Sequence, residues 1–169
     1  YLVTANTSAI GGTTIPLKDD GINPDETKDD AIYTGIQAIS NGTGYETITA
    51  TINDNTGNIF YASASLFVDD ISPNAKIVIN NNETYTKSRE VQLNLNYSDN
   101  YGIDKCRYGN NLTELNNYEW EPCSNVKFWR LTENEEKKIV FYQVRDLAGN
   151  SATANDTIIY DKTPPAILI

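Results

Sequence analysis

The sequence predicts an all-β fold made of two β-sandwich domains in series. Apolar and polar residues alternate with a period of two in several segments, whereas helical periodicity is scarce. Clusters of Asn, Asp, Gly and Ser, which tolerate turn geometry, separate these segments. The chain has 169 residues, which is too many for one ordinary sandwich of about 100 residues and suits two small ones.

Four segments carry the clearest strand pattern: residues 48–52, 62–68, 91–97 and 139–145. In each of them every second residue is apolar, so that one face of the strand points to a core. Thr, Tyr, Ile and Val are frequent in the predicted strands, as half-buried pleated surfaces favour.

An internal repeat fixes the register of the two domains. The motif D-x-x-G-N occurs at residues 54–58 and again at 146–150, and in both places one strand and an acidic, proline-containing segment follow it. The distance from the motif to that acidic segment is 15 residues both times. We interpret D-x-x-G-N as a tight hairpin turn, in which Asp accepts local N–H groups and Gly adopts a positive φ.

The repeat predicts the domain boundaries. We expect one domain in residues 1–70 and a second in residues 71–161, joined by a linker that proline stiffens at Asp69–Pro73. Residues 162–169 are then either the start of a following module or a strand that is donated to another molecule.

Composition excludes several classes of function. The chain has 23 acidic and 13 basic residues and a net charge of −10, with no basic stripe for nucleic acid or anionic lipid. Histidine is absent, which removes the usual general base and the commonest transition-metal ligand. No apolar run approaches the roughly 20 residues that span a bilayer. We expect no enzyme, no nucleic-acid partner and no membrane insertion in this segment.

Residues 73–165 have a proline-led first strand, a second strand that ends in S-D-N-x-G at Ser98–Gly102, and a D-x-A-G-N hairpin. In these features they resemble the bacterial and archaeal Ig-like repeats of large extracellular surface proteins. Residues 3–70 resemble a related fibronectin-III-like module, although Asp30 or Ala31 stands where such modules usually carry Gly. The resemblance implies Ig-like sandwiches at the cell surface, and it says little about function because this architecture hosts many roles.

In modules similar to the first, one or two strands precede the segment V-T-A at residues 3–5. The first domain is therefore expected to lack its N-terminal edge strand, and residues 166–169 would be a spare first strand. Three explanations stay open: an excerpt from a long array, a domain that dispenses with the strand, and a head-to-tail fibre. In the fibre, the C-terminal strand of one subunit completes the open sheet of its neighbour.

Two kinds of covalent modification are expected outside the cell. The only two cysteines, Cys106 and Cys123, predict a disulfide that closes a loop of about 17 residues and stabilises the fold by about 3 kcal/mol. Sequons for N-glycosylation are about twice as frequent as chance gives in this composition. The full set is Asn6, Asn41, Asn82, Asn96, Asn111 and Asn155. We favour Asn41, Asn82 and Asn111, because these three lie in predicted turns.

Calcium is the one cofactor that the sequence suggests, at two places. A loop packs six oxygen-bearing side chains into twelve residues: Asp19, Asp20, Asn23, Asp25, Asp29 and Asp30. At the domain junction, the topology of an Ig-like sandwich gathers four carboxylates at one pole: Asp69, Asp70, Asp99 and Asp146. In both places the alternative is turn chemistry, with the carboxylates capping backbone N–H groups.

An aromatic platform for sugar rings is a further hypothesis, from Trp120, Trp129, Tyr108 and Tyr118, with core packing as the alternative. The sequence thus predicts a structural or interaction protein of a surface layer, adhesin or filament, whose partners are copies of itself or other surface proteins. A spacer or glycan-binding accessory module of a secreted hydrolase is the competing interpretation.

Overall fold

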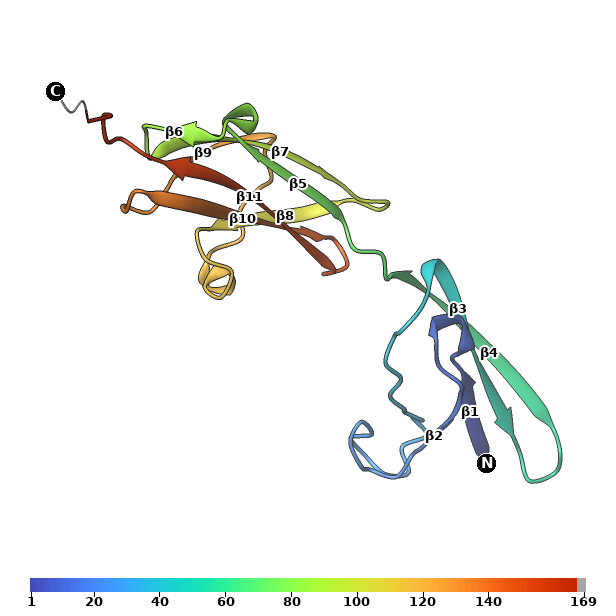
Figure 1. The fold of residues 1–169 in the computed structure, drawn as a ribbon. Helices are drawn as coiled ribbons and strands as arrows, with labels where there is room; N and C mark the ends of the chain where they lie inside the picture. The colour runs from blue at the N-terminus through green and yellow to red at the C-terminus, as the bar shows by residue number, and fades with distance from the viewer. Residues whose placement is uncertain (167–169) are drawn as a thin grey trace. The chain divides into compact units, whose positions relative to one another are not determined.

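The computed structural model describes residues 1–166, and nearly all of its regular structure is β (Figure 1). The chain divides into two compact units, Tyr1–Asp70 and Ile71–Ile169. The expected all-β class is therefore confirmed. Within the described residues, no helix is long and apolar enough to cross a membrane.

Unit 1 is built on one antiparallel sheet with the strand order β2-β1-β3-β4. Its elements are β1 (Leu2–Asn6), the short 3-10 helix η1 (Ser8–Ile10), β2 (Thr14–Leu17), β3 (Thr43–Asn53) and β4 (Ile59–Asp69). Among the residues described in this unit, no second sheet faces the first. A long connection between β2 and β3 runs beside the sheet instead (Figure 1).

The β2–β3 connection is attached to the sheet by backbone hydrogen bonds. Lys18 and Thr34 exchange two N–H···O bonds of 2.9 Å, and the Ser40 N–H donates to the Ile10 carbonyl at 3.1 Å. Ala31 in this connection has a φ of +65°, a conformation that glycine adopts without strain. Of the two positions where the fibronectin-III-like pattern expects glycine, Ala31 therefore has a backbone that suits it, whereas Asp30 is not among the residues with a positive φ.

Unit 2 is a sandwich of two sheets, in the orders β6-β11-β10-β8 and β5-β7-β9. The strands are β5 (Asn74–Ile79), β6 (Tyr85–Thr86), β7 (Glu90–Ser98), β8 (Ile103–Gly109), β9 (Val126–Arg130), β10 (Glu136–Asp146) and β11 (Ser151–Tyr160). Two 3-10 helices, η2 (Asn80–Asn82) and η3 (Leu115–Asn117), lie in the connections. All strand pairs are antiparallel except β6 with β11.

The core of unit 2 lies between these sheets and follows the predicted alternation. Val91, Leu93 and Leu95 of β7 are buried, and so are Val140, Tyr142 and Val144 of β10; only Tyr97 stays half-buried. Burying large aliphatic side chains in this way stabilises a fold by about 1.5–3 kcal/mol each.

Both D-x-x-G-N segments form the predicted hairpin turns, which join β3 to β4 and β10 to β11. The glycines have the expected positive φ, +91° at Gly57 and +100° at Gly149. After β11 the chain has no regular structure as far as Ala166. The rest of the strand predicted at residues 166–169 lies outside the described residues.

Candidate functional site

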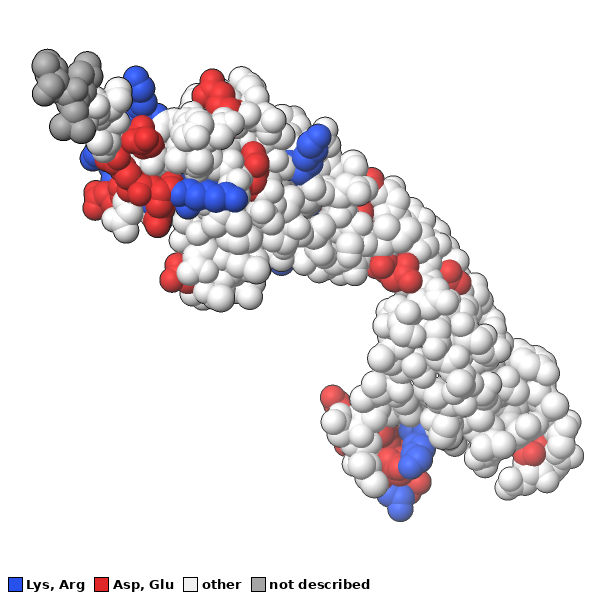
Figure 2. Space-filling model, in the orientation of Figure 1, with Lys and Arg blue, Asp and Glu red and all other residues white. Residues whose placement is uncertain are grey.

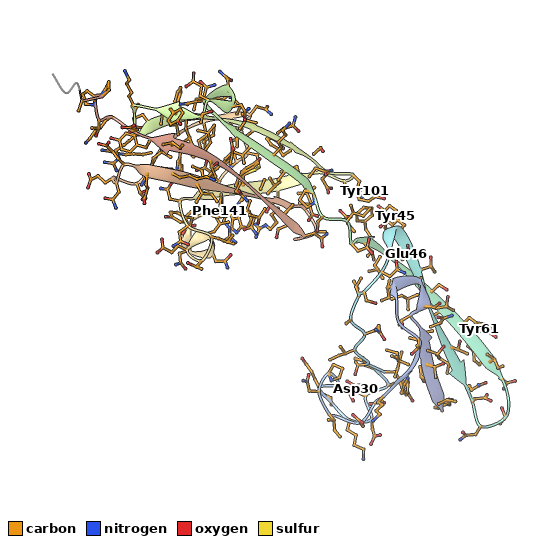
Figure 3. The ribbon with its side chains drawn as sticks, viewed as in Figure 1. Asp30, Tyr45, Glu46, Tyr61, Tyr101 and Phe141 are labelled. Atoms are coloured by element: carbon orange, nitrogen blue, oxygen red, sulfur yellow. A yellow bond between two sulfur atoms is a disulfide. The ribbon has the colours of Figure 1, made fainter. Side chains whose placement is uncertain are left out.

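The sheet of unit 1 has one apolar face, which the strand registers define. Val3 pairs with Ile52, and Ile52 pairs with Phe60, so these three side chains share a face. By the same register, Ala5, Ala50 and Ala62 lie in the next row. The opposite face is largely polar, and its Tyr45 and Tyr61 side chains project from β3 and β4 (Figure 3).

This apolar face is covered only in part. Val3 and Ala5 on β1 are buried, and so is Val68 at the end of β4. Along the rest of β4, however, Ala62 and Ala64 are exposed and Phe60 is 60% exposed. In a complete sandwich a second sheet would cover such a face, because apolar strand faces are stable only when packed. The structure therefore leaves an apolar surface open on the β3–β4 hairpin.

Strand β4 also forms an edge of the sheet, since β3 is its only partner among the described strands. An edge strand presents unpaired N–H and C=O groups that another strand can bond. Natural proteins usually protect such edges with charged residues, proline or bulges. From Ile59 to Val68, β4 contains no charged residue and no proline, and its register with β3 is unbroken.

Residues 59–68 of β4 lack charge, although unit 1 as a whole is strongly acidic. Residues 1–70 hold ten acidic and two basic residues, so this unit carries −8 of the total charge of −10. In Figure 2, charged side chains gather over the β2–β3 connection, whereas the visible surface over β3 and β4 is mostly uncharged. Residues 59–68 are thus an uncharged stretch in an acidic unit, although Glu46 of β3 lies opposite Leu66 and Asp54 lies in the turn. Another acidic molecule would meet the least repulsion along this stretch of β4.

The acidic loop brings three of its six predicted ligands together. Asp19, Asp25 and Asp30 each offer a carboxylate oxygen, and these atoms lie within 4.8 Å of one another. Asp25 is 4% exposed, and its Oδ2 accepts the Gly21 N–H at 2.6 Å. Asp30 lies in the loop between β2 and β3 (Figure 3). Three carboxylates this close repel one another unless hydrogen bonds or a cation compensate them.

Carboxylates of the same loop also accept hydrogen bonds from its backbone N–H groups, as they do in tight turns. The two oxygens of Asp19 accept the N–H groups of Asp30 and Ala31 at 3.1 and 3.0 Å. Asp20 caps the Ile22 N–H at 3.0 Å. The remaining predicted ligands lie apart from the three-carboxylate group: Asp20 pairs with Lys18, Asp29 pairs with Lys28, and Asn23 lines a separate cavity of about 250 Å³.

The four carboxylates predicted at the junction belong to different units. Asp69 ends β4, and Asp70 accepts the Thr43 hydroxyl at 2.8 Å within unit 1. In unit 2, oxygens of Asp99 and Asp146 lie within 4.8 Å of each other. Asp99 Oδ2 accepts the Tyr101 N–H at 2.8 Å, and Asp146 holds the β10–β11 turn. A shared calcium site at the junction stays a prediction.

The cysteines and the sequons have clear positions. Cys106 in β8 and Cys123 in the β8–β9 connection form a disulfide, with their Cα atoms 5.1 Å apart. All six sequon asparagines are exposed, as glycosylation requires. Asn41, Asn82 and Asn111 lie outside the strands, whereas Asn6, Asn96 and Asn155 lie within β1, β7 and β11.

The four aromatic residues of the predicted platform do not form one surface. Tyr108, Tyr118 and Trp129 line a cavity of about 360 Å³ at the side of unit 2. Trp120 is not among its lining residues. The guanidinium carbons of Arg107 and Arg145 lie 4.3 and 4.6 Å from the centroid of the Trp120 ring instead.

The two arginines explain the position of Trp120. Guanidinium groups stack favourably on indole faces. Burial, and then the neighbouring charge of Arg145, lower the pKa of Arg107, whose hydrogen bonds go to the neutral side chains of Gln143 and Asn116. The aromatic residues alone do not indicate the two arginines that contact Trp120. The arginines come together because β8 pairs with β10, with Arg107 opposite Gln143, and no motif in the sequence shows this contact.

Comparisons with known proteins find similar solved structures but no matching protein family. No protein-family model matches the chain, and no curated protein matches it. A solved structure of the fibronectin(III)-like modules of Clostridium thermocellum CbhA is similar at 14% identity and a TM-score of 0.46, over 94% of this chain and 77% of that one. A tetra-tandem repeat from the extending region of a large adhesion protein is similar at 14% identity and a TM-score of 0.32. That match covers 95% of this chain and 41% of the other.

Proposed function

We propose that this chain is a non-enzymatic structural and interaction segment of an extracellular surface protein, such as a surface layer, an adhesin or a filament. The open apolar face and the unprotected edge of β4 in unit 1 are the observation that carries this proposal. The absence of histidine from the sequence and the exposed sequons agree with it. In this role the β-units set length and present surfaces, and unit 1 accepts a strand from a neighbouring molecule.

A second copy of the chain is the proposed donor. The segment 164–169, P-P-A-I-L-I, is uncharged and apolar, and therefore matches the uncharged residues 59–68 along the edge of β4. The Thr163 hydroxyl donates to Glu135 at 2.6 Å, which fixes the point where this segment leaves unit 2. A strand from this segment would add main-chain hydrogen bonds at the β4 edge and place every second side chain beside Phe60, Ala62 and Ala64, which widens the apolar face.

The proposal is tested by the size of the purified chain in solution as a function of concentration. Ala64→Lys places a charge on the apolar face of β4, and Ser63→Lys places the same charge one residue away on the opposite face. Deletion of residues 164–169 removes the proposed donor. We expect concentration-dependent oligomers that Ala64→Lys and the deletion abolish and that Ser63→Lys largely keeps. A chain that stays monomeric at all concentrations would contradict strand donation.

We also propose that calcium binds the acidic loop of unit 1 through Asp19, Asp25 and Asp30. The proximity of the three carboxylates supports this site, and oxygen ligands of this kind are what calcium prefers. Each carboxylate oxygen has more than one lone pair, so the hydrogen bonds to Gly21, Asp30 and Ala31 leave room for coordination. Bound calcium would cross-link the long β2–β3 connection.

An accessory module of a secreted hydrolase is the second candidate function. The cavity lined by Tyr108, Tyr118 and Trp129 favours it, because aromatic walls beside polar groups suit a sugar ring. The two candidates use different units of the chain. Each can therefore fail without the other.

A further inference from the structure

The cavity of about 360 Å³ in unit 2 lies where the sandwich is open at its side. Strand β8 is the edge of one sheet and β9 is the edge of the other. Tyr108 comes from β8, Lys127 and Trp129 come from β9, and the connection between the strands adds Tyr118 and its neighbours. The cavity therefore reaches from the surface to a core residue, and its volume falls in the range of small-molecule sites, about 300–1,000 Å³.

Tyr108 supplies a buried polar atom without a partner. The residue is 3% exposed, and its hydroxyl is one of two buried side-chain polar atoms with no hydrogen bond in residues 1–166. The ring is fixed between Tyr142, stacked with its centroid at 5.3 Å, and the Lys127 ammonium, 4.9 Å from the Tyr108 centroid. An unsatisfied buried hydroxyl costs about 1–3 kcal/mol, so a ligand that reaches it recovers free energy on binding.

The neighbouring polar groups of this region are satisfied, which makes Tyr108 an exception. The Tyr142 hydroxyl lies 3.2 Å from Cys106 Sγ, and the Trp129 Nε1–H donates to Asn110 Oδ1 at 2.8 Å. Buried polar atoms are normally hydrogen-bonded, and each exception calls for an explanation such as a bound molecule. The cavity beside Tyr108 offers a place for one.

The chemistry of the walls selects a class of ligand. Tyr118 and Trp129 offer aromatic surfaces for C–H groups, and Glu119 and Asn117 offer oxygen acceptors for hydroxyl groups. Glu121 is neutralised by Lys127 at 2.6 Å. Glu119 forms no ion pair within residues 1–166, so its negative charge disfavours anions in the cavity. A neutral pyranose ring combines the apolar face and the donor hydroxyls that these walls match.

We propose that this cavity binds a single neutral pyranose ring, such as the end of a glycan, with the Tyr108 hydroxyl bonded to one sugar hydroxyl. This inference names the ligand class for the second candidate function and rests on that candidate. Strand acceptance by unit 1 is independent of it. An assembly experiment that fails therefore says nothing against the sugar site, and the reverse also holds.

The test is a titration of the intact chain, followed by tryptophan fluorescence and by NMR. The probes are the methyl pyranosides of glucose, galactose, mannose and N-acetylglucosamine, with tetramethylammonium as a cationic probe of the same aromatic walls. Tyr108→Phe removes only the hydroxyl and keeps the stacked ring. Tyr142→Phe is the matched control, because it removes a hydroxyl from the same core outside the cavity. Trp120→Phe controls for the tryptophan that does not line the cavity.

We expect saturable binding of at least one pyranoside, weakened about two- to tenfold by Tyr108→Phe and little changed by the two control variants. Without ligand, Tyr108→Phe should be at least as stable as the parent chain, because it removes an unsatisfied buried hydroxyl. The proposal is overturned if no pyranoside binds, if only tetramethylammonium binds, or if Tyr108→Phe binds as tightly as the parent.

Discussion

Asp54 holds Asn58 across a hairpin turn through three hydrogen bonds. Asp54 Oδ1 accepts the Asn58 backbone N–H at 2.8 Å, Oδ2 accepts the Asn58 side-chain amide at 2.7 Å, and the Asp54 N–H donates to the Asn58 carbonyl at 3.1 Å. Asp146 makes the same three bonds to Asn150, at 2.8, 3.0 and 3.0 Å. The repeated motif therefore encodes one turn geometry in both units.

The two aspartates differ in burial, and this difference leads to the first prediction. Asp146 is 1% exposed. Replacing it with alanine removes the carboxylate that accepts the Asn150 N–H and makes the shorter of the two bonds to the Gly149 N–H, so we expect unit 2 to lose about 3 kcal/mol of unfolding free energy. Hydrogen exchange of the β10 and β11 amides measures this loss. Asp54→Ala is the matched control and should affect only the β3–β4 hairpin. Unchanged exchange in Asp146→Ala would refute the structural role of this turn.

The Asp54 turn also responds to pH. Hydrogen bonds from the Asn58 side chain, then from the Asn58 backbone and Thr56, hold the pKa of Asp54 well below its ordinary value of 3.8. Because the folded-state pKa is lowered, the stabilisation is present above pH 3.8 and is lost as the pH falls through the folded-state value.

Two core tyrosines predict a loss of stability in alkali. Burial raises the pKa of both Tyr108 and Tyr142 above the ordinary value of 10.0, and Glu121 adds to the effect on Tyr108. In the unfolded chain both phenols lose their protons near pH 10, whereas in the folded chain they keep them. The unfolding free energy should therefore be constant below about pH 9 and fall as the pH rises above about 10.

Urea unfolding at a series of alkaline pH values checks this prediction. Tyr142→Phe should make the decline shallower, while Tyr45→Phe, at an exposed tyrosine of unit 1, should leave it as it is. An unfolding free energy that is equally flat at all these pH values would show that neither buried phenol is linked to folding.

Calcium should raise the melting temperature of unit 1. A ligand that binds only the native state stabilises it, by about 2.7 kcal/mol when present at 100 times its dissociation constant. Asp25→Asn should remove the shift because Asp25 belongs to the three-carboxylate group, and Asp29→Asn should keep it because Asp29 does not. The measurement is a thermal melt with calcium and with a chelator. Equal melting temperatures in both conditions would exclude the site.

Ala31→Gly should stabilise unit 1 by about 0.5–1 kcal/mol, because φ at this residue is +65° and an L side chain is strained there. Ala38→Gly is the control in the same connection, since Ala38 is not among the residues with a positive φ. It should leave the stability unchanged or lower it slightly. Differential scanning calorimetry compares the two variants. A lower melting temperature in Ala31→Gly would show that this backbone is not strained.

The period-two pattern predicted the strands and their faces well because it reports burial directly. Val91, Leu93 and Leu95 alternate inward as expected, and both hairpins follow from D-x-x-G-N. The apolar–polar alternation does not show which element, if any, packs on the apolar face of a strand. Ala62 and Ala64 have the alternation of a core strand, yet they are exposed, because no second sheet packs on them in the described part of unit 1.

The candidate sites were predicted less completely, since they depend on contacts between residues that are distant in sequence. Three of the six loop ligands come together because Asp19 captures the N–H groups of Asp30 and Ala31 and closes the loop. Trp120 was assigned to a sugar platform, whereas two arginines on neighbouring strands hold its ring away from the cavity. No spacing along the chain encodes such a cross-strand cluster.

Amide exchange along β4 tests whether unit 1 accepts a strand from a second copy. In a monomer, the N–H groups of residues 59–65 that point away from β3 have no strand partner among the described residues and should exchange quickly. If unit 1 accepts a strand from a second copy, these outward amides should become protected in concentrated samples and stay unprotected in the chain that lacks residues 164–169. Fast exchange of these outward amides at every concentration would contradict strand acceptance by unit 1.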